Sequence, residues 1–180
     1  MRIIKRYFSA TLLAIPLLSS AQDKGEELLI WNTKKLDWAD YKGKPDPNSD
    51  AAASTATYLG IEYNVRSNDI SFKITCYFSK NKSWGLAKTE HILSHEQGHF
   101  DIAEVFARKL NKKMSEYRVN KSTFRNDLEK IYNDILEEKE KTQNLYDRET
   151  NYSRNKEQQT KWLKKIEDML EELEDYSDYH

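Results

Sequence analysis

The chain has 180 residues, of which 38% are hydrophobic and 33% charged, and its formal net charge at pH 7 is −1. This length is that of one domain with one core. The basic residues are interleaved with acidic ones rather than gathered in patches, which argues against a nucleic-acid-binding protein.

The N-terminal segment has the pattern of a secretory signal peptide. A basic start at residues 1–6 precedes an apolar run over residues 12–18, and Ser19-Ser20-Ala21 offers small residues for cleavage. The apolar run is too short for a membrane anchor and is interrupted by Pro16. No cysteine follows it, which argues against a lipoprotein. We therefore expect residues 1–21 to be removed.

Cleavage there would leave a single domain over residues 22–180. It would carry 26 basic and 30 acidic side chains. The expected product is an exported protein that keeps no stable membrane anchor. The sequence leaves its oligomeric state open.

Residues 22–57 show little periodicity. The first periodic pattern follows them and predicts a β-hairpin. Apolar residues occupy every second position on both sides of the polar loop Ser67-Asn68-Asp69, first from Leu59 to Val65 and then from Ile70 to Phe78. Such alternation is typical of strands. One apolar and one polar face predict a small antiparallel sheet, the hairpin at about 57–78, with one face in solvent.

Cys76 lies in the second of these strands and is the only cysteine of the chain, so it cannot form an internal disulfide. It alternates with Ile74 and Phe78, which favours a small apolar core residue. A catalytic thiol is disfavoured because no histidine lies near it in sequence.

A helix is predicted from Thr89, which can cap its first turn, with Glu90 at the positive end. Its apolar stripe includes Ile92, Ile102 and Phe106 at helical spacing. His95 and His99 fall on the same stripe. The histidine pair should therefore point into the protein body.

The pattern His95-Glu96-Gln97-Gly98-His99 has the spacing of a metal site, H-E-x-x-H. Residues four apart lie on one helix face, about one 5.4 Å turn apart, so both imidazoles can reach one zinc ion. Glu96 is offset by about a third of a turn and could take a proton from a metal-bound water. The spacing favours a zinc-dependent hydrolase, most simply a peptidase. Without a metal, burying three polar side chains would cost several kcal/mol.

Two more helices are predicted downstream. Lys121-Ser122-Thr123 opens one whose apolar stripe runs from Phe124 to Ile135, and Trp162 and Ile166 belong to another. The polar stretch between them, residues 144–155, reads as an irregular connection.

A catalytic zinc usually has a third protein ligand. His91 is disfavoured because it lies eight residues, about 12 Å along a helix, from His99. His180 is at the chain end, and Glu104 projects away from His95. The H-x-x-G-x-x-H extension of metzincins is absent.

The segment from Tyr146 to Tyr152 is the best remaining source of the third ligand. It offers oxygen ligands at Asp147, Glu149 and Tyr152. An ordinary helix–helix connection is an equally good interpretation of this segment.

Several stretches together resemble a bacterial domain-of-unknown-function family of predicted secreted zinc-dependent proteases. They include Leu36–Pro45, Ala52–Thr55, His95–Glu104 and the downstream pattern Tyr146-Asp147-x-x-Thr150. The resemblance covers most of the mature chain and implies a zincin-like α+β fold and an exported bacterial protein, periplasmic or secreted. It names no substrate.

In that family the downstream segment often reads Tyr-Asp-x-x-Thr-x-His-Gly. Here Tyr152 and Ser153 stand at the His and Gly positions. If that histidine is a ligand in the family, this chain must use Tyr152 or a neighbouring carboxylate, or bind metal weakly.

The sequence thus predicts an α+β, zincin-like domain with a small antiparallel sheet and three main helices. His95 and His99 are expected to bind Zn²⁺, with Glu96 as the general base for hydrolysis of a peptide or protein substrate. Tyr146 or Tyr152 would donate a hydrogen bond to the oxyanion, and the strand at 70–78 would align the substrate.

Two other classes of protein remain open. One is a catalytically silent metal-binding cell-envelope interaction protein, which Tyr152 in place of histidine favours. The other is a helical interaction protein whose histidine pair is accidental.

Overall fold

The computed structural model describes residues 25–31, 35–66 and 69–179. The predicted signal peptide, residues 1–21, lies outside these residues, so its cleavage and the start of the mature domain stay predictions. Within the described part, no helix combines the length and apolar character needed to cross a membrane.

The predicted hairpin is confirmed. Strand β3 (Thr57–Arg66) pairs antiparallel with strand β4 (Asp69–Ser79) along its whole length. Four pairs of apolar residues face each other in this register: Leu59–Cys76, Ile61–Ile74, Tyr63–Phe72 and Val65–Ile70. The period-two pattern of the sequence therefore fixes both the strands and their register.

Three shorter strands complete the sheets. Strand β1 (Leu28–Ile30) pairs with the C-terminal end of β4, giving the order β1-β4-β3. Strands β2 (Ala53–Ser54) and β5 (Trp84–Gly85) form a separate antiparallel pair. A Cβ on Gly85 would lie 2.5 Å from the Trp38 ring, so only glycine allows this ring to lie against β5.

The helices are α1 (Glu90–Glu116), α2 (Phe124–Thr150) and α3 (Lys156–Glu172). As predicted, Thr89 caps α1 by accepting a hydrogen bond from the Ile92 amide. A 3₁₀ helix, η1 (Trp38–Asp40), precedes the sheets, and a second, η2 (Glu174–Tyr176), follows α3. The described residues thus form an α+β fold, as expected.

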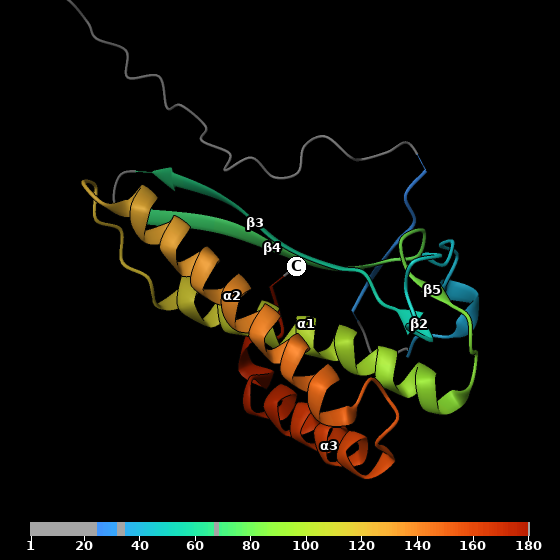
Figure 1. Ribbon diagram of the computed structural model, residues 1–180. Helices are drawn as coiled ribbons and strands as arrows, with labels where there is room; N and C mark the ends of the chain where they lie inside the picture. Colours follow the sequence, from blue (N-terminus) through green and yellow to red (C-terminus); the bar gives the residue numbers. More distant parts are fainter. Residues whose placement is uncertain (1–24, 32–34, 67–68, 180) are drawn as a thin grey trace, which may run out of the picture.

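Helix α1 is the central element because it packs against β3, β4, α2 and α3. In Figure 1 the curved hairpin lies above the helices, with α1 between the sheet and α3. The core between α1 and the hairpin includes Phe78, Cys76, Ile102 and Phe106, each at most 1% exposed. Burial raises the pKa of the Cys76 thiol, which agrees with a core role and not with a nucleophile.

One prediction about secondary structure is wrong. Residues 144–150 are not an irregular connection but the last two turns of α2, which ends at Asn151 in a left-handed conformation. One face of α2 carries a row of residues spaced four apart. The row has apolar side chains at Ile131 and Ile135 and polar ones at Lys139, Gln143 and Asp147. Those three polar residues line a cavity and not the core, so the apolar stripe stops before the helix does.

Candidate metal centre

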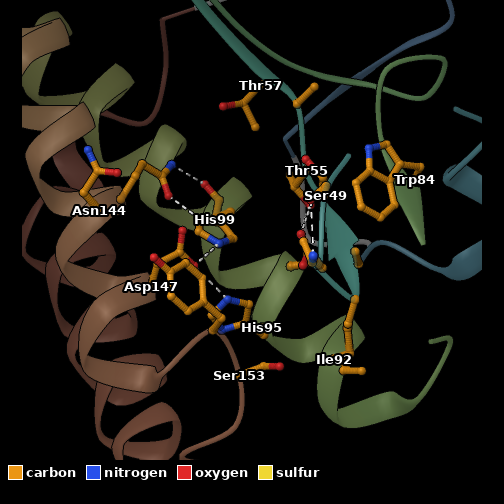
Figure 2. Close-up of a pocket in the computed structure, with 18 of the residues that line it drawn as sticks. Ser49, Thr55, Thr57, Trp84, Ile92, His95, His99, Asn144, Asp147 and Ser153 are labelled. Atoms are coloured by element: carbon orange, nitrogen blue, oxygen red, sulfur yellow. Dashed lines mark hydrogen bonds and ion pairs between the residues drawn. The ribbon is translucent and has the colours of Figure 1, made fainter. Parts of the chain in front are cut away.

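His95 and His99 lie on one face of α1, as their spacing requires, and their side chains converge on Asp147 of α2 (Figure 2). Each ring presents its Nε2 atom to the same carboxylate oxygen, Asp147 Oδ1, at 3.1 Å. The ligand atoms of the three residues all lie within 4.8 Å of one another. Among the described residues, this is the group of His, Cys, Asp and Glu side chains that could hold a metal ion.

Of the third-ligand candidates, only Asp147 joins the histidine pair. The Glu149 carboxylate instead accepts a hydrogen bond from Trp162 Nε1 at 2.7 Å, on the α3 side. Tyr152 lies at the rim of the cavity and is 59% exposed. Asp147 belongs to α2, which extends beyond the site to Thr150. The sequence pattern did not indicate this length of the helix.

Two of the disfavoured residues, His91 and Glu104, lie elsewhere, as expected. His91 Nε2 lies 2.6 Å from the Ser153 carbonyl oxygen, and Gln159 donates a hydrogen bond to the His91 carbonyl. Glu104 is buried in an ion pair with Arg108. His180 lies outside the described residues.

Gln143, one helical turn before Asp147, determines which nitrogen of His99 carries the proton. Its amide nitrogen donates to the His99 carbonyl at 2.9 Å, so its amide oxygen faces His99 Nδ1. That oxygen can only accept, so Nδ1 must be the donor. In the neutral ring, Nε2 then carries a lone pair aimed at the Asp147 carboxylate.

Two lone pairs facing each other at 3.1 Å repel unless a positive charge lies between them. That charge can be a second proton on His99 or a metal ion. Burial disfavours the charged ring, but the hydrogen bond to Asp147 and the negative charge of Glu96 outweigh it and raise the pKa of His99. Burial likewise opposes ionisation of Asp147, yet the bonds from His95 and His99 hold its pKa well below the usual value. The three side chains are therefore stable together when a proton or a metal ion supplies a positive charge between them.

Tyr146 supports the two histidines from behind. Its ring stacks on His95 and meets His99 edge-on, and its hydroxyl donates to the His95 carbonyl at 3.1 Å. The predicted role of Tyr146 as an oxyanion donor is wrong, because this side chain is fully buried and its proton is already donated. Gly98 provides the space, since a Cβ there would lie 2.5 Å from the Tyr146 hydroxyl.

Glu96 lies beside the histidine pair and lines the same cavity, although it is only 4% exposed. One of its carboxylate oxygens, Oε2, accepts a hydrogen bond from Thr55 at 2.7 Å. Thr55 in turn lies 3.0 Å from the Tyr41 hydroxyl. Glu96, the expected neighbour of the histidine pair, is therefore linked by hydrogen bonds to two residues from outside α1.

The cavity has a volume of about 1050 Å³ and is bounded by α1, the end of α2 and the segment 51–57. Figure 2 shows Thr55, Thr57 and Trp84 across the cavity from His99. The strand at 70–78 was the predicted substrate-aligning edge, but no residue of that strand lines the cavity. This strand is β4, the central strand of the three-stranded sheet, and its C-terminal end lies between β1 and β3.

The model of a family of bacterial proteins of unknown function, DUF922, matches residues 35–155, two thirds of the chain. The chain belongs to this family. The match spans every residue of the site, from Tyr41 to Asp147. Comparisons with curated proteins and with solved structures give no significant match. The expectation of a bacterial family of unknown function is thus confirmed.

Sequence reasoning missed Gln143, Thr55 and Tyr41 in this DUF922 domain. Gln143 carries a detectable signal, because it lies four residues before Asp147 in the polar row of α2. Thr55 and Tyr41 lie in two of the stretches that carry the family resemblance, but no local pattern links them to Glu96, which the tertiary fold brings to Thr55 from 41 residues away.

Proposed function

We propose that this protein is a zinc-dependent hydrolase, specifically a metallopeptidase with a zincin-like arrangement. His95, His99 and Asp147 would hold the zinc ion, and Glu96 would be the general base. The proposal joins the H-E-x-x-H spacing on α1 with an antiparallel sheet packed against that helix.

One observation carries the proposal: two imidazole nitrogens and one carboxylate oxygen converge where a positive charge is needed. Ligand atoms bound at about 2.1 Å in a tetrahedral site lie about 3.4 Å from one another. The two nitrogen–oxygen distances of 3.1 Å are close to this value, and all three ligand atoms lie within 4.8 Å of one another. Two histidines and one carboxylate are a common ligand set of catalytic zinc.

The residues present therefore fit zinc. A zinc ion held here would polarise a substrate carbonyl and make a water molecule a better nucleophile. The cavity beside the three ligands leaves room for that water and for substrate.

Glu96 would accept the proton of the attacking water and later deliver it to the leaving amine. Its position supports this role, because it follows His95 on α1 and faces the cavity. Thr55 occupies Oε2, so Oε1 is the oxygen that remains to take the proton.

A peptide is the substrate that the cavity favours. Its volume of about 1050 Å³ is at the upper end of small-molecule sites, which are typically ~300–1,000 Å³. The wall at 51–57 includes β2 and the start of β3, so extended backbone borders the site. Extended backbone can pair with an extended chain.

The silent metal-binding protein is the competing hypothesis, and Glu96→Gln separates the two. Zinc-loaded wild type and Glu96→Gln would be incubated with a proteome-derived peptide library, and new termini counted by mass spectrometry. We expect wild type to cleave and Glu96→Gln to lose at least 100-fold in rate while keeping its zinc. Equal cleavage by both would contradict the role of Glu96. No cleavage by zinc-loaded wild type would favour the silent protein.

A further inference from the structure

The Thr55 hydroxyl lies between two buried polar groups, the Tyr41 phenol and the Glu96 carboxylate. Thr55 Oγ1 is 2.7 Å from Glu96 Oε2 and 3.0 Å from the Tyr41 oxygen. Tyr41 is 5% exposed and Glu96 4%. The three side chains come from three separate parts of the sequence and meet only in the fold.

The direction of these hydrogen bonds follows from their chemistry. A carboxylate can only accept, so Thr55 donates its one proton to Glu96. Tyr41 must then donate to the Thr55 oxygen. Burial raises the pKa of the Tyr41 phenol, which keeps that proton on the tyrosine. The two hydrogen bonds therefore point in the same direction, from Tyr41 to Thr55 and from Thr55 to Glu96.

The segment that carries Tyr41 is fixed to the same helix as Glu96. The Leu36 amide donates to the Gln97 side-chain oxygen at 2.8 Å, and Gln97 directly follows Glu96 on α1. Asp37 and Asp40 close the turn of η1 by reciprocal hydrogen bonds. The stretch Leu36–Pro45 contributes no ligand to the proposed metal site. These hydrogen bonds show what part of it does: they anchor the segment that carries Tyr41 next to Glu96.

Aromatic packing holds the Tyr41 ring itself. Its ring centroid lies 4.9 Å from that of Trp38 and 5.1 Å from that of Phe78, which belongs to the core between β4 and α1. The phenol hydroxyl is therefore presented from a rigid base, and Thr55 is held by its place between β2 and β3.

We propose that Tyr41 and Thr55 are positioning residues that hold the Glu96 carboxylate by Oε2 and leave Oε1 for proton transfer. This inference rests on the proposed function, because it assigns the support of the proposed general base. Among the described residues, no hydrogen bond joins Tyr41 or Thr55 to His95, His99 or Asp147. Their loss should therefore affect Glu96 and leave the metal ligands intact.

The test compares Thr55→Val, which keeps the shape but removes the hydroxyl, with Thr55→Ser, which keeps the hydroxyl. Tyr41→Phe removes the outer donor, and Glu96→Gln is the reference for loss of the base. Thr142→Val is the matched control, since this hydroxyl bonds to its own helix at the Glu138 carbonyl, outside the cavity.

Two quantities would be measured on purified protein. The first is the zinc dissociation constant, from competition with a chromogenic chelator. The second is the affinity of the zinc-loaded protein for acetohydroxamic acid, by calorimetry. A hydroxamic acid binds zinc and can give its proton to a carboxylate beside the metal, so its affinity reports the position of Glu96 without any knowledge of the substrate.

We expect all variants to bind zinc within about threefold of wild type. Hydrogen bonds to charged groups are among the stronger ones, so Thr55→Val should weaken acetohydroxamate binding about tenfold. Glu96→Gln should weaken it at least as much and Tyr41→Phe less. Thr55→Ser and Thr142→Val should bind as wild type does. Once a cleaved peptide is known, Thr55→Val should lower kcat and leave KM unchanged.

The other outcomes would overturn either the positioning role alone or the proposed function together with it. If Glu96→Gln weakens hydroxamate binding but Thr55→Val and Tyr41→Phe do not, the positioning role is wrong and the proposed function stands. If wild type binds no zinc, or Glu96→Gln binds acetohydroxamate as wild type does, the proposed function fails and this inference with it. If Thr55→Val does not fold, Tyr41→Phe decides the question: weaker acetohydroxamate binding supports the positioning role, and unchanged binding overturns it.

Discussion

Tyr146 stacks on His95 with ring centroids 4.5 Å apart and ring planes inclined by 19°. The same tyrosine meets the ring of His99 at 5.0 Å, close to perpendicular. One buried aromatic side chain from α2 therefore orients both imidazoles of α1, and it can do so only because Gly98 has no side chain in its way.

The first prediction concerns Gly98→Ala. On an ordinary helix this change is stabilising by up to about 1 kcal/mol. Here the new Cβ would lie 2.5 Å from the Tyr146 hydroxyl, so the tyrosine or the helix must move. We expect a lower melting temperature and about tenfold weaker zinc binding, measured by thermal unfolding and chelator competition.

Tyr146→Phe in the Gly98→Ala background serves as the internal control. It removes the hydroxyl that is closest to the new Cβ, so it should recover part of the lost stability. A Gly98→Ala variant that melts higher than wild type and binds zinc equally well would show that the close contact has no consequence.

A second prediction separates the three oxygen ligands that the sequence left open. Asp147→Asn should lower zinc affinity by more than 100-fold, since it removes the charge that faces both histidines. Glu149→Gln and Tyr152→Phe should stay within about threefold of wild type, because Glu149 bonds to Trp162 and Tyr152 is exposed at the rim. Zinc titration of the three variants checks this. A loss confined to Tyr152→Phe would move the third ligand to that residue.

A third prediction concerns Gln143, whose side-chain oxygen accepts a hydrogen bond from His99 Nδ1. Gln143→Leu removes the acceptor and should weaken zinc binding by about 10–100-fold. Gln143→Glu keeps an acceptor and should bind zinc at least as well as wild type. Chelator competition would measure both. If Gln143→Leu and the neighbouring control Thr142→Val gave equal affinities, the orienting role would be wrong.

A fourth prediction concerns a buried ion pair that belongs to the fold and not to the site. Arg108 donates to Glu104 at 2.9 Å, and both side chains are at most 4% exposed. Arg108→Ala leaves the buried Glu104 carboxylate without its charged partner, with the Tyr179 hydroxyl still donating to it, and should cost about 3–5 kcal/mol in the free energy of unfolding. Urea unfolding would measure the loss. The folded fraction should still bind zinc as wild type does, because the pair lies outside the cavity.

Local patterns made much of the fold predictable. The alternation from Leu59 to Phe78 encodes the hairpin and its register, since a slip of one residue would turn every apolar side chain to the other face. The α1 cap at Thr89 and the convergence of His95 and His99 also follow from short-range geometry.

The remainder of the site depends on tertiary contacts that no local pattern records. The sequence could name Asp147 only as one of three oxygen ligands, because the i, i+4 row of α2 turns polar at Lys139, where this face of the helix begins to line the cavity. Strands β2 and β5 have two residues each, too few for a periodic signal. Thr55 acquires its role only when these strands bring it to Glu96.

The most direct measurement is a zinc titration of the chelator-stripped protein, with thermal unfolding recorded at each step. We predict one zinc ion per wild-type chain and a melting temperature that rises as the site fills, since a ligand at 100 times its Kd stabilises the fold by about 2.7 kcal/mol. Glu96→Gln should titrate in the same way, and His99→Ala should show no saturable binding. Absence of saturable zinc binding by folded wild type, or equal binding by His99→Ala, would contradict the assignment of His95, His99 and Asp147 as a metal centre.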